Sequence, residues 1–349
     1  MAEHWMELPR LVLISEDALA RLEEFLARLG LRPPYLIVSG PNVARLAAPL
    51  LPASIRDSAG WYIAEASTLD EARRVGEYAH ARGFGAVLAL GGGKTVDVAK
   101  MASRLASLPF ISLPSSASHD GIASPFASLK GSGRPYSLEA RSPLGVLADL
   151  SLIARAPRRY LLSGCADLLA KLTAVKDWQL ARDEKGEYYG SYAAKLAELS
   201  ARVVIANAEL IAAAEREGVR CVVEALISAG VAACIAGSSR PCSGAEHLIS
   251  HALDLLAPGK GLHGEKCGVA ASLTARLHGL DWRQVSDTLR LIGAPSTFAE
   301  LGIDHETAAR AIVLAPSLRP ERFTILHKLR PTREQALRLV EQLEAEVAI

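Results

Sequence analysis

The sequence carries almost no net charge, and this absence limits the partners to be expected. Its 39 lysines and arginines balance 38 aspartates and glutamates over 349 residues, which leaves a formal net charge of +1. Proteins that bind nucleic acids or anionic membrane surfaces concentrate positive charge in patches. We therefore expect neither nucleic acid nor a membrane surface as a partner, while a local basic pocket for a small phosphate remains compatible with this composition.

Cysteine pairs and long apolar runs are also missing. The five cysteines form no CxxC pair and their number is odd, which argues against a disulfide framework. The first residues, MAEHWMELPR, have neither the basic leader nor the apolar core of a signal peptide. The most apolar stretch, around residues 221–236, is interrupted by Glu224 and Gly230 and is short for a bilayer. These observations predict a cytoplasmic protein without a membrane span.

The length suggests about two domains, and the sequence pattern changes once along the chain. From residue 10 to 150, helix-length segments separate short β-rich runs at 11–15, 35–40, 60–67, 85–90 and 110–114, followed by an irregular hairpin around Gly131-Ser132-Gly133. From about Arg158 the pattern is helical, over 166–184, 190–215, 217–236, 244–256, 263–278, 282–292, 304–315 and 332–347. We predict an α/β, Rossmann-like domain with a parallel sheet over residues 1–155, an all-α domain over 156–349, and a ligand cleft between them.

A glycine-rich segment, LALGGGKTVDVAK at residues 88–100, joins a predicted strand to a predicted amphipathic helix. A Walker loop requires a glycine where Leu88 stands, and the dinucleotide fingerprint requires its third glycine where Val96 stands. Neither motif is present. Gly91, Gly92 and Gly93 nevertheless leave bare backbone N–H groups at a helix N-terminus, an arrangement that favours an anion.

Three histidines lie within the segment SRPCSGAEHLISHALDLLAPGKGLHGEKCG, residues 239–268. His247 and His251 share one face of a predicted helix, and His263 begins the next helix after a turn. Histidines in this arrangement, together with a carboxylate, indicate a divalent-metal site. The candidate carboxylate is Asp167, near the start of the predicted helix 166–184. The alternative is that the histidines are structural. Cys242 and Cys267 are possible soft ligands, but buried inert thiols are the simpler interpretation, as for Cys165.

Taken together, GGGKTVDVAK, the stretch LLSGCADLLAKLTAVKDW around Asp167 and the histidine segment resemble the archaeal sn-glycerol-1-phosphate dehydrogenases of ether-lipid synthesis. That family belongs to a wider group with glycerol dehydrogenases, iron-containing alcohol dehydrogenases and dehydroquinate synthases. The resemblance covers most of the chain. It implies a dinucleotide-binding first domain, a metal- and substrate-binding second domain, and a homo-oligomer that reduces dihydroxyacetone phosphate to sn-glycerol 1-phosphate with NADH or NADPH.

The same resemblance implies roles for individual residues. It makes Asp167, His247 and His263 zinc ligands and brings Asp120, Asp167 and His251 to the substrate. The residues that it implies around the dinucleotide pyrophosphate are Gly91, Gly92, Gly93, Lys94, Thr95, Val96 and Asp97. Those that it implies on the nicotinamide side are Ser115, Ser116, Ala117, Ser118 and Ser124, although SLPSSASHDGIAS is also compatible with a plain serine-rich turn.

Two departures help to choose among members of the wider group. Iron-dependent alcohol dehydrogenases have a histidine four residues after the metal-binding aspartate, where this chain has Lys171, so zinc is favoured over iron. Dehydroquinate synthases share the His-x3-His-x11-His spacing but have glutamate where this chain has Asp167, a difference that favours a dehydrogenase.

Lys171 itself is a candidate to bind the substrate phosphate, or else a solvated helix lysine. The remaining alternatives are a glycerol dehydrogenase, a lyase-cyclase of the dehydroquinate synthase type, and a nucleotide-binding regulatory protein.

In the implied reaction, zinc polarises the C2 carbonyl of dihydroxyacetone phosphate for hydride transfer from the nicotinamide. Either His251, or Asp120 through a water molecule, then supplies the proton. After the strand YLIV, Ser39, Gly40, Pro41 and Asn42 provide no acidic residue to bind the ribose 2′-hydroxyl and repel a 2′-phosphate. We therefore expect both NADH and NADPH to be used, and expect Ser39→Asp to weaken NADPH selectively.

Overall fold

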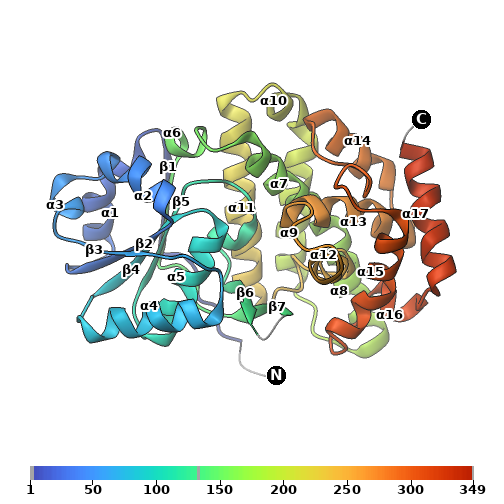
Figure 1. Ribbon diagram of the computed structural model, residues 1–349, viewed down its shortest axis with the longest axis horizontal. Coiled ribbons are helices and arrows are strands. Elements are labelled where there is room, and N and C mark those ends of the chain that lie inside the picture. The colour runs from blue at the N-terminus through green and yellow to red at the C-terminus, as the bar shows by residue number, and fades with distance from the viewer. Residues whose placement is uncertain (1–3, 132–133, 348–349) are drawn as a thin grey trace. The chain divides into compact units, whose positions relative to one another are not determined.

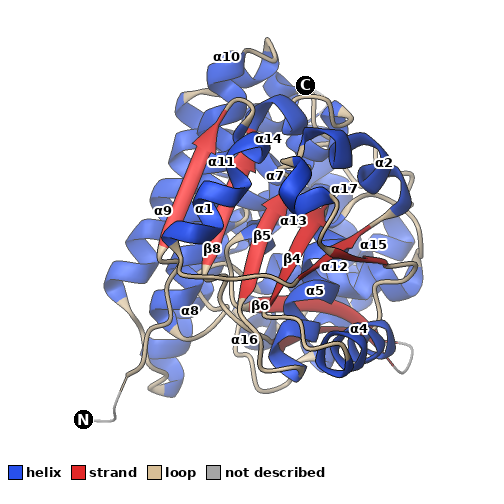
Figure 2. Ribbon diagram, turned by 90° about the vertical axis from the view of Figure 1, so that its left-hand side faces the viewer, coloured by secondary structure: helices blue, strands red, loops and turns tan. Residues whose placement is uncertain are grey.

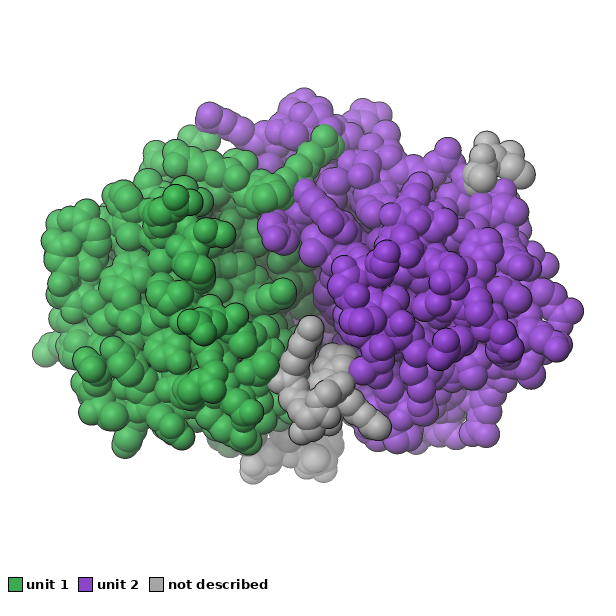
Figure 3. All heavy atoms as spheres, viewed as in Figure 1, with its two compact units in different colours: residues 1–158 green, residues 159–349 purple. Residues whose placement is uncertain are grey.

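Parallel strands organise the first of the two units into which the computed structural model divides, residues 1–158 and 159–349 (Figure 3). The structure describes residues 4–131 and 134–347. Six strands pair in the order β1-β8-β5-β4-β2-β3, and every pair in this sheet is parallel. Their bounds are β1 Leu11–Ser15, β2 Tyr35–Ser39, β3 Gly60–Ile63, β4 Ala86–Gly91, β5 Phe110–Pro114 and β8 Gly145–Asp149. The predicted α/β fold class is confirmed.

Helices cover both faces of this sheet, as the alternation of its buried residues requires. Leu36 and Val38 of β2 pack into one apolar cluster, together with Val75 from α4 (Leu69–Ala81) and Val96 from α5 (Gly93–Leu105). Ile37, between them in the sequence, packs into the cluster on the opposite face. Figure 2 shows the strands in red with the helices around them. The helical segments are η1 Ala18–Arg21, α1 Leu22–Arg28, α2 Pro41–Ala47, η2 Ala48–Leu50, α3 Ala53–Arg56, α4 Leu69–Ala81, α5 Gly93–Leu105, η3 Asp120–Ile122 and α6 Leu150–Ile153.

The five β-rich runs of the sequence are all strands, but one central strand was missed. Strand β8 lies between β1 and β5 and is fully buried. Its five residues, GVLAD, follow the irregular segment and are too few to show a period, so the sequence pattern did not separate them from it. The expected hairpin is present as the antiparallel pair β6 Phe126–Gly131 and β7 Arg134–Glu139; Ser132 and Gly133, which the prediction also named, lie outside the described residues.

The second unit is helical throughout its described residues, as predicted (Figure 1). Its helices are α7 Arg158–Leu169, α8 Lys171–Lys185, α9 Ser191–Ala206, α10 Ala208–Ala212, α11 Arg216–Ala236, α12 Ala245–Leu256, α13 His263–Leu277, α14 Trp282–Ile292, α15 His305–Leu318, α16 Ile325–Leu329 and α17 Arg333–Val347. Two predictions of single helices were wrong, because 166–184 breaks at Ala170 and 190–215 breaks at Asn207. Helix α16, with five residues, was too short to be predicted.

Helix α11 corrects the prediction made for the most apolar stretch of the sequence. Glu224 and Gly230 interrupt its apolar pattern but not the helix, which runs for 21 residues and is long and apolar enough to cross a membrane by length and composition. However, 67% of its most apolar 18-residue stretch is buried inside the protein. The prediction that this stretch is too short for a bilayer was therefore wrong, and it is burial that marks α11 as a core helix of its unit.

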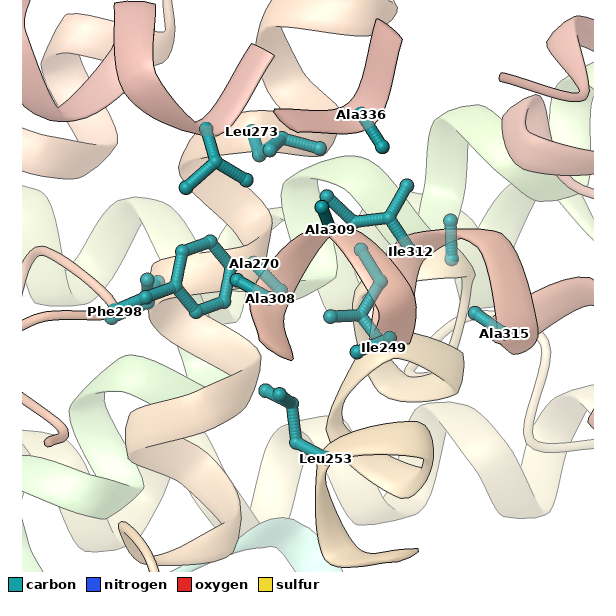
Figure 4. Close-up of a cluster of buried hydrophobic side chains, with 14 of the residues drawn as sticks. Ile249, Leu253, Ala270, Leu273, Phe298, Ala308, Ala309, Ile312, Ala315 and Ala336 are labelled. Atoms are coloured by element: carbon teal, nitrogen blue, oxygen red, sulfur yellow. The ribbon is translucent and has the colours of Figure 1, made fainter. Parts of the chain in front are cut away.

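One apolar cluster of the helical unit joins α12, α13, α15 and α17 (Figure 4). Phe298, which precedes α15, is fully buried in this cluster together with Ile249, Leu273 and Ile312. Removing a buried aromatic ring forfeits its transfer free energy and leaves a cavity. The cluster is therefore expected to fix the position of α12, the helix that carries His247 and His251.

We expect Phe298→Ala to lower the free energy of unfolding of the helical unit by about 3–5 kcal/mol. Denaturant unfolding followed by circular dichroism measures this change. The control is Leu291→Ala, on α14, whose side chain is 53% exposed and should change stability by less than about 1 kcal/mol. Equal losses for the two variants would contradict the importance assigned to the cluster.

Candidate functional site

Four side chains of the helical unit bring metal-binding atoms together. One ligand atom from each of Asp167, His247, His263 and Cys267 lies within 4.8 Å of the others. Asp167, His247 and Cys267 are buried, and His263 is partly buried. The group thus contains the three residues predicted as zinc ligands, with a thiol added.

These side chains come from three helices. Asp167 is in the last turn of α7, His247 is in the first turn of α12, and His263 begins α13 with Cys267 one turn later. Helices α12 and α13 pack against each other, so the centroids of the His247 and His263 rings are 5.1 Å apart. The helical hairpin expected from the sequence therefore brings His263 back to His247.

The start of α13 is held directly against α7. A Cβ atom at Gly264 would lie 1.9 Å from the carbonyl oxygen of Ser163 on α7, so glycine is needed for this approach. Glu265 on α13 accepts hydrogen bonds from the Arg159 guanidinium at 2.6 and 2.7 Å. Both contacts hold the start of α13 against α7, the helix that carries Asp167.

The spacing of the donor atoms fits a tetrahedral zinc ion. Oxygen and nitrogen ligands of such an ion are separated by about 3.3 Å. Oδ1 of Asp167 is 3.3 Å from Nε2 of His247. Sγ of Cys267 is 3.7 Å from Nε2 of His263, within hydrogen-bond distance for sulfur, so the thiol lies beside the group as a neighbour of His263. Nitrogen and oxygen ligands are among those that zinc takes in proteins. The residues present therefore fit this metal.

Lys171 is committed to the carboxylate of this group. Its side chain is fully buried, and Nζ donates hydrogen bonds to Oδ2 of Asp167 at 2.9 Å and to the carbonyl oxygen of Cys242 at 3.2 Å. The alternative of a solvated helix lysine was therefore wrong. Burial alone would raise the pKa of Asp167, but the positive charge of Lys171, with the His247 and His263 rings, lowers this pKa well below its usual value.

A second buried carboxylate orients His247. Nδ1 of His247 donates to Oε1 of Glu246 at 2.8 Å, which leaves Nε2 to face Asp167. Glu246 also accepts hydrogen bonds from the backbone N–H of Gly244 at 2.6 Å and from the hydroxyl of Thr173 at 2.9 Å. Carboxylates that hold the distal nitrogen of a metal-binding histidine fix its tautomer and ring orientation. No sequence signal had pointed to Glu246.

Asp177 anchors the N-terminus of α12 from α8. Its fully buried carboxylate accepts from the backbone N–H groups of Ala245 and Ile325, at 2.6 Å each, and from Nε2 of His278 at 2.9 Å. Burial raises its pKa. A carboxylate at a helix N-terminus satisfies donors that the helix leaves open and interacts favourably with its dipole. Asp177 thereby fixes the turn from which His247 projects.

His251 lies one turn beyond His247 and stays outside the group of four ligand atoms. Its ring stacks on that of His263 with centroids 6.1 Å apart. Burial lowers the pKa of His251 to about 3, and the positive charges of His247, Arg319, Lys266 and Arg322 act in the same direction. The imidazole is therefore neutral at physiological pH, in positively charged surroundings.

The other cysteines considered as ligands lie elsewhere. The Cys242 thiol donates to the carbonyl oxygen of Ala229 at 3.2 Å and, like the buried Cys165, is absent from the metal-ligand group found among the described residues. The prediction of inert thiols agrees with these positions, whereas Cys267 lies beside the candidate ligands. The sequence signal for this position was the four-residue spacing from His263 to Cys267, which places the thiol one helical turn after a candidate ligand.

In the first unit, the glycine turn joins β4 to α5 at the carboxyl edge of the sheet. Gly91 ends β4, Gly92 is the N-cap of α5, and Gly93 is its first residue. A Cβ atom at Gly93 would lie 1.8 Å from Nε2 of His119, and one at Gly92 would lie 3.2 Å from Oγ of Ser116. The backbone of the glycine turn therefore packs directly against the loop after β5. The N–H groups at the N-terminus of α5 lie beside this contact, and such groups are the donors that an anion site requires.

The strand order places this turn at a topological switch point. Strand β2 leads outward to β3, whereas β4 leads to β5 in the opposite direction. Ligands of open parallel sheets bind where the order reverses, at the carboxyl ends of the strands. Gly40, which follows β2, is close enough that its Cβ would lie 3.8 Å from Oγ1 of Thr95. The residues predicted for the dinucleotide thus border the expected crevice.

The serine segment after β5 is part of this edge. Ser115, Ser116, Ala117 and Ser124 are buried, while Ser118 is partly buried. The backbone N–H of Ser115 donates to the carbonyl oxygen of Gly91 at 2.9 Å, which ties the loop to the glycine turn. Asp120 begins η3 in the same loop. A role at the nicotinamide or the substrate stays a prediction for each of these residues.

Within GGGKTVDVAK, the charged residues differ in their surroundings. Lys94 is exposed at the start of α5, and Val96 is buried in the apolar cluster. The Asp97 carboxylate is buried and accepts from the backbone N–H of Ser128 at 3.0 Å. Lys100, also buried, lies 3.5 Å from Asp97. These contacts direct the Asp97 side chain to the loop and hairpin after β5, and a role for Asp97 at the pyrophosphate stays a prediction.

The placement of the cofactor-discriminating position at Ser39 was wrong. Its side chain is fully buried, and Oγ donates to the carbonyl oxygen of Leu90 at 2.7 Å. Aspartate there would bury a carboxylate between two strands, at a cost to folding rather than to NADPH binding. Gly40, the next residue, is partly exposed and has space for a side chain.

Comparisons with known proteins identify relatives over nearly the whole chain. The glycerol-1-phosphate dehydrogenase, NAD(P)+, of Cenarchaeum symbiosum is 48% identical over 344 residues, covering 97% of this chain and 96% of the relative. That of Pyrococcus horikoshii is 45% identical and covers 95% and 97%. The chain belongs to the glycerol-1-phosphate dehydrogenase family.

The wider relationships of this glycerol-1-phosphate dehydrogenase family agree with the fold. Residues 13–157 match the iron-containing alcohol dehydrogenase family; this stretch ends before Asp167 and so carries no information on the metal. The glycerol dehydrogenase of Schizosaccharomyces pombe superimposes with a TM-score of 0.81 at 18% identity, over 100% of this chain and 92% of that one. At this identity the likeness shows the fold alone.

We expect Glu246→Gln to weaken zinc binding about 10- to 100-fold, because His247 loses the charged acceptor that orients its ring. Competition with a chromophoric chelator measures the zinc dissociation constant. Glu341→Gln, at an exposed position of α17, is the matched control and should bind zinc as the unaltered protein does. An unchanged dissociation constant in Glu246→Gln would contradict the positioning role.

Proposed function

We propose that this chain catalyses the reversible, NAD(P)H-dependent reduction of dihydroxyacetone phosphate to sn-glycerol 1-phosphate, the backbone of archaeal ether lipids. The observation that carries the proposal is the group formed by Asp167, His247 and His263 in a chain of the glycerol-1-phosphate dehydrogenase family. We further propose that the enzyme is cytoplasmic and homo-oligomeric. These last two expectations follow from the sequence and stay predictions.

Asp167, His247 and His263 would hold a zinc ion as three protein ligands and leave one position open for the substrate. Three protein ligands with an open position distinguish catalytic zinc from structural zinc. When bound there, zinc supplies a Lewis acid that polarises a carbonyl. Lys171 and Glu246 would keep the carboxylate and the His247 ring in place through the hydrogen bonds described above.

His251 would face the substrate as a neutral imidazole. A neutral ring has one N–H group and one lone pair, so it is able to pass a proton on while it receives another. The depressed pKa of about 3 means that it does not store a proton at physiological pH. Asp120 through water remains the other candidate for the proton transfer.

The glycine turn, Lys94 and Thr95 would bind the pyrophosphate of NADH or NADPH, which supplies the hydride. Backbone N–H groups at the α5 N-terminus are the donors for such a group. A glycerol dehydrogenase is disfavoured as an alternative because the relatives at 44–48% identity are named for the phosphorylated product. A lyase-cyclase would show no net consumption of NADH.

The reaction itself is tested by the loss of NAD(P)H absorbance with dihydroxyacetone phosphate, followed by chiral analysis of the product. Chelation should abolish turnover while the protein stays folded, because its helical core is built from apolar packing. Formation of sn-glycerol 3-phosphate, or turnover that is unaffected after metal removal, would overturn the proposal.

Two histidine substitutions should separate metal binding from catalysis. His263→Ala is expected to lower zinc content and activity together, since it removes a ligand. His251→Ala should retain zinc but lower kcat by about 100-fold or more, because its imidazole serves the substrate. Metal analysis and kinetics of both purified variants provide the comparison. Full zinc content and normal NADH oxidation in His263→Ala would rule out the assignment.

Cofactor preference should respond to Gly40→Asp. Gly40 is the N-cap of α2, has a φ of −85° and leaves room for a side chain, so aspartate is tolerated and even favoured there. Its charge would repel the 2′-phosphate of NADPH and raise the ratio of KM for NADPH to KM for NADH by about tenfold or more. Gly40→Asn, the uncharged isostere, should leave this ratio nearly unchanged. Equal ratios in the two variants would contradict the placement.

A further inference from the structure

Two arginines project from one turn that follows α15. The backbone N–H of Arg322 donates to the carbonyl oxygen of Arg319 at 2.9 Å, so the two residues form the ends of a β-turn. The Arg319 side chain is 29% exposed and pairs with Glu321 at 2.9 Å. Arg322 is buried, with only 7% of its surface exposed.

Arg322 is a buried cation without its own counter-ion. It donates to the carbonyl oxygen of Ser243 and to Oγ of Ser239, both at 2.7 Å, and no carboxylate pairs with it among the residues that the structure describes. The carboxylates whose charge reaches it, Glu187 and Glu321, each already pair with another arginine. A guanidinium has five N–H groups, so donors remain for a further acceptor.

This charge lies next to the metal group. Arg322 holds the carbonyl of Ser243, while Lys171, which binds Asp167, holds the carbonyl of the preceding residue, Cys242. The turn between α11 and α12 thus connects Arg322 to the carboxylate by consecutive hydrogen bonds.

A third cation reaches the same neighbourhood from α13. Lys266 lies one turn after His263 and bonds at 2.5 Å to Asp254, which lies one turn after His251 on α12. The charges of Lys266, Arg319 and Arg322 all act on the His251 ring. Asp254 compensates the charge of Lys266, and Glu321 compensates that of Arg319. Arg322 has no paired carboxylate among the described residues, and a buried charge is costly unless an opposite charge compensates it. Arg322 is therefore the cation near His251 that favours an anion.

We propose that Arg319 and Arg322, supported by the charge of Lys266, bind the phosphate group of the substrate beside His251. The assignment rests on the proposed function and extends it by naming the residues that distinguish a phosphorylated ketone from an unphosphorylated one. In dihydroxyacetone phosphate three bonds separate C2 from phosphorus, so a carbonyl at the zinc places the phosphate a short distance away. Arginine suits this task because its planar donors match phosphate oxygens in pairs.

The test compares dihydroxyacetone phosphate with dihydroxyacetone, which lacks only the phosphate. Arg322→Gln and Arg319→Gln should each raise KM for dihydroxyacetone phosphate about 10- to 100-fold, because a charge-assisted hydrogen bond is lost. The kcat/KM for dihydroxyacetone and the zinc content should stay nearly constant. If Arg322 only stabilises the turn that it contacts, kcat/KM will fall equally for both substrates, and the proposal fails.

Arg310→Gln is the matched control, because it removes the same charge from an exposed position on α15. Nine residues of helix place it about 13 Å from Arg319, beyond the screening length of about 8 Å at physiological salt. It should not change KM for either substrate. If Arg322→Gln does not fold, Arg319→Gln decides alone, and an unchanged KM for dihydroxyacetone phosphate in that variant overturns the proposal.

Inorganic phosphate provides a readout that does not depend on the proposed reaction. It should raise the thermal midpoint of the unaltered protein, because a ligand that binds the folded state stabilises it, and should have little effect on either arginine variant. If the unaltered protein does not reduce dihydroxyacetone phosphate, the proposed function fails, and the phosphate shift then judges the site by itself. An equal shift in the unaltered protein and both variants would overturn the site.

Discussion

The buried bond between Lys171 and Asp167 is the interaction on which the metal group depends. The two residues are four apart, but a break at Ala170 ends α7 and begins α8 between them, and both side chains are almost fully buried. Burying an ion pair is costly unless further hydrogen bonds satisfy both partners. Here the ammonium also binds the Cys242 carbonyl, so the pair connects α7 and α8 to the turn before α12.

Other buried carboxylates continue this arrangement into α12. Asp177 holds the backbone at Ala245, and Glu246 holds the His247 ring, so both the helix and its side chain have fixed positions without a metal. Preorganised ligands spend little binding free energy on ordering, which favours metal affinity and a defined geometry. Among the described residues, Arg322 donates to two uncharged acceptors, one of them the carbonyl oxygen of Ser243 in the turn before α12. The metal site and the proposed anion site therefore depend on the same turn.

The two units meet different physical requirements. In the first, glycines allow backbone to approach backbone at the edge of a parallel sheet, where N–H groups at the α5 N-terminus attract phosphate. In the second, helices bring charged side chains into apolar surroundings, where each charge needs a partner. Family membership extends over both units, whereas the likeness to glycerol dehydrogenase structures at low identity speaks only for the shared fold.

The sequence alone determined the fold class and five of the six strands of the sheet, because these follow from local periods. The spacing of the histidines indicated a metal site, and the resemblance of the motifs to a known family supplied the candidate ligands Asp167, His247 and His263. Only the tertiary structure decided the place of β8, the partners of Lys171 and Glu246, the burial of Ser39, and the hydrogen bonds of Arg322 to the turn before α12. Those features join residues that are far apart in the sequence, as Leu11 of β1 and Gly145 of β8 are. Burial and charge pairing between such residues arise only when the chain has folded.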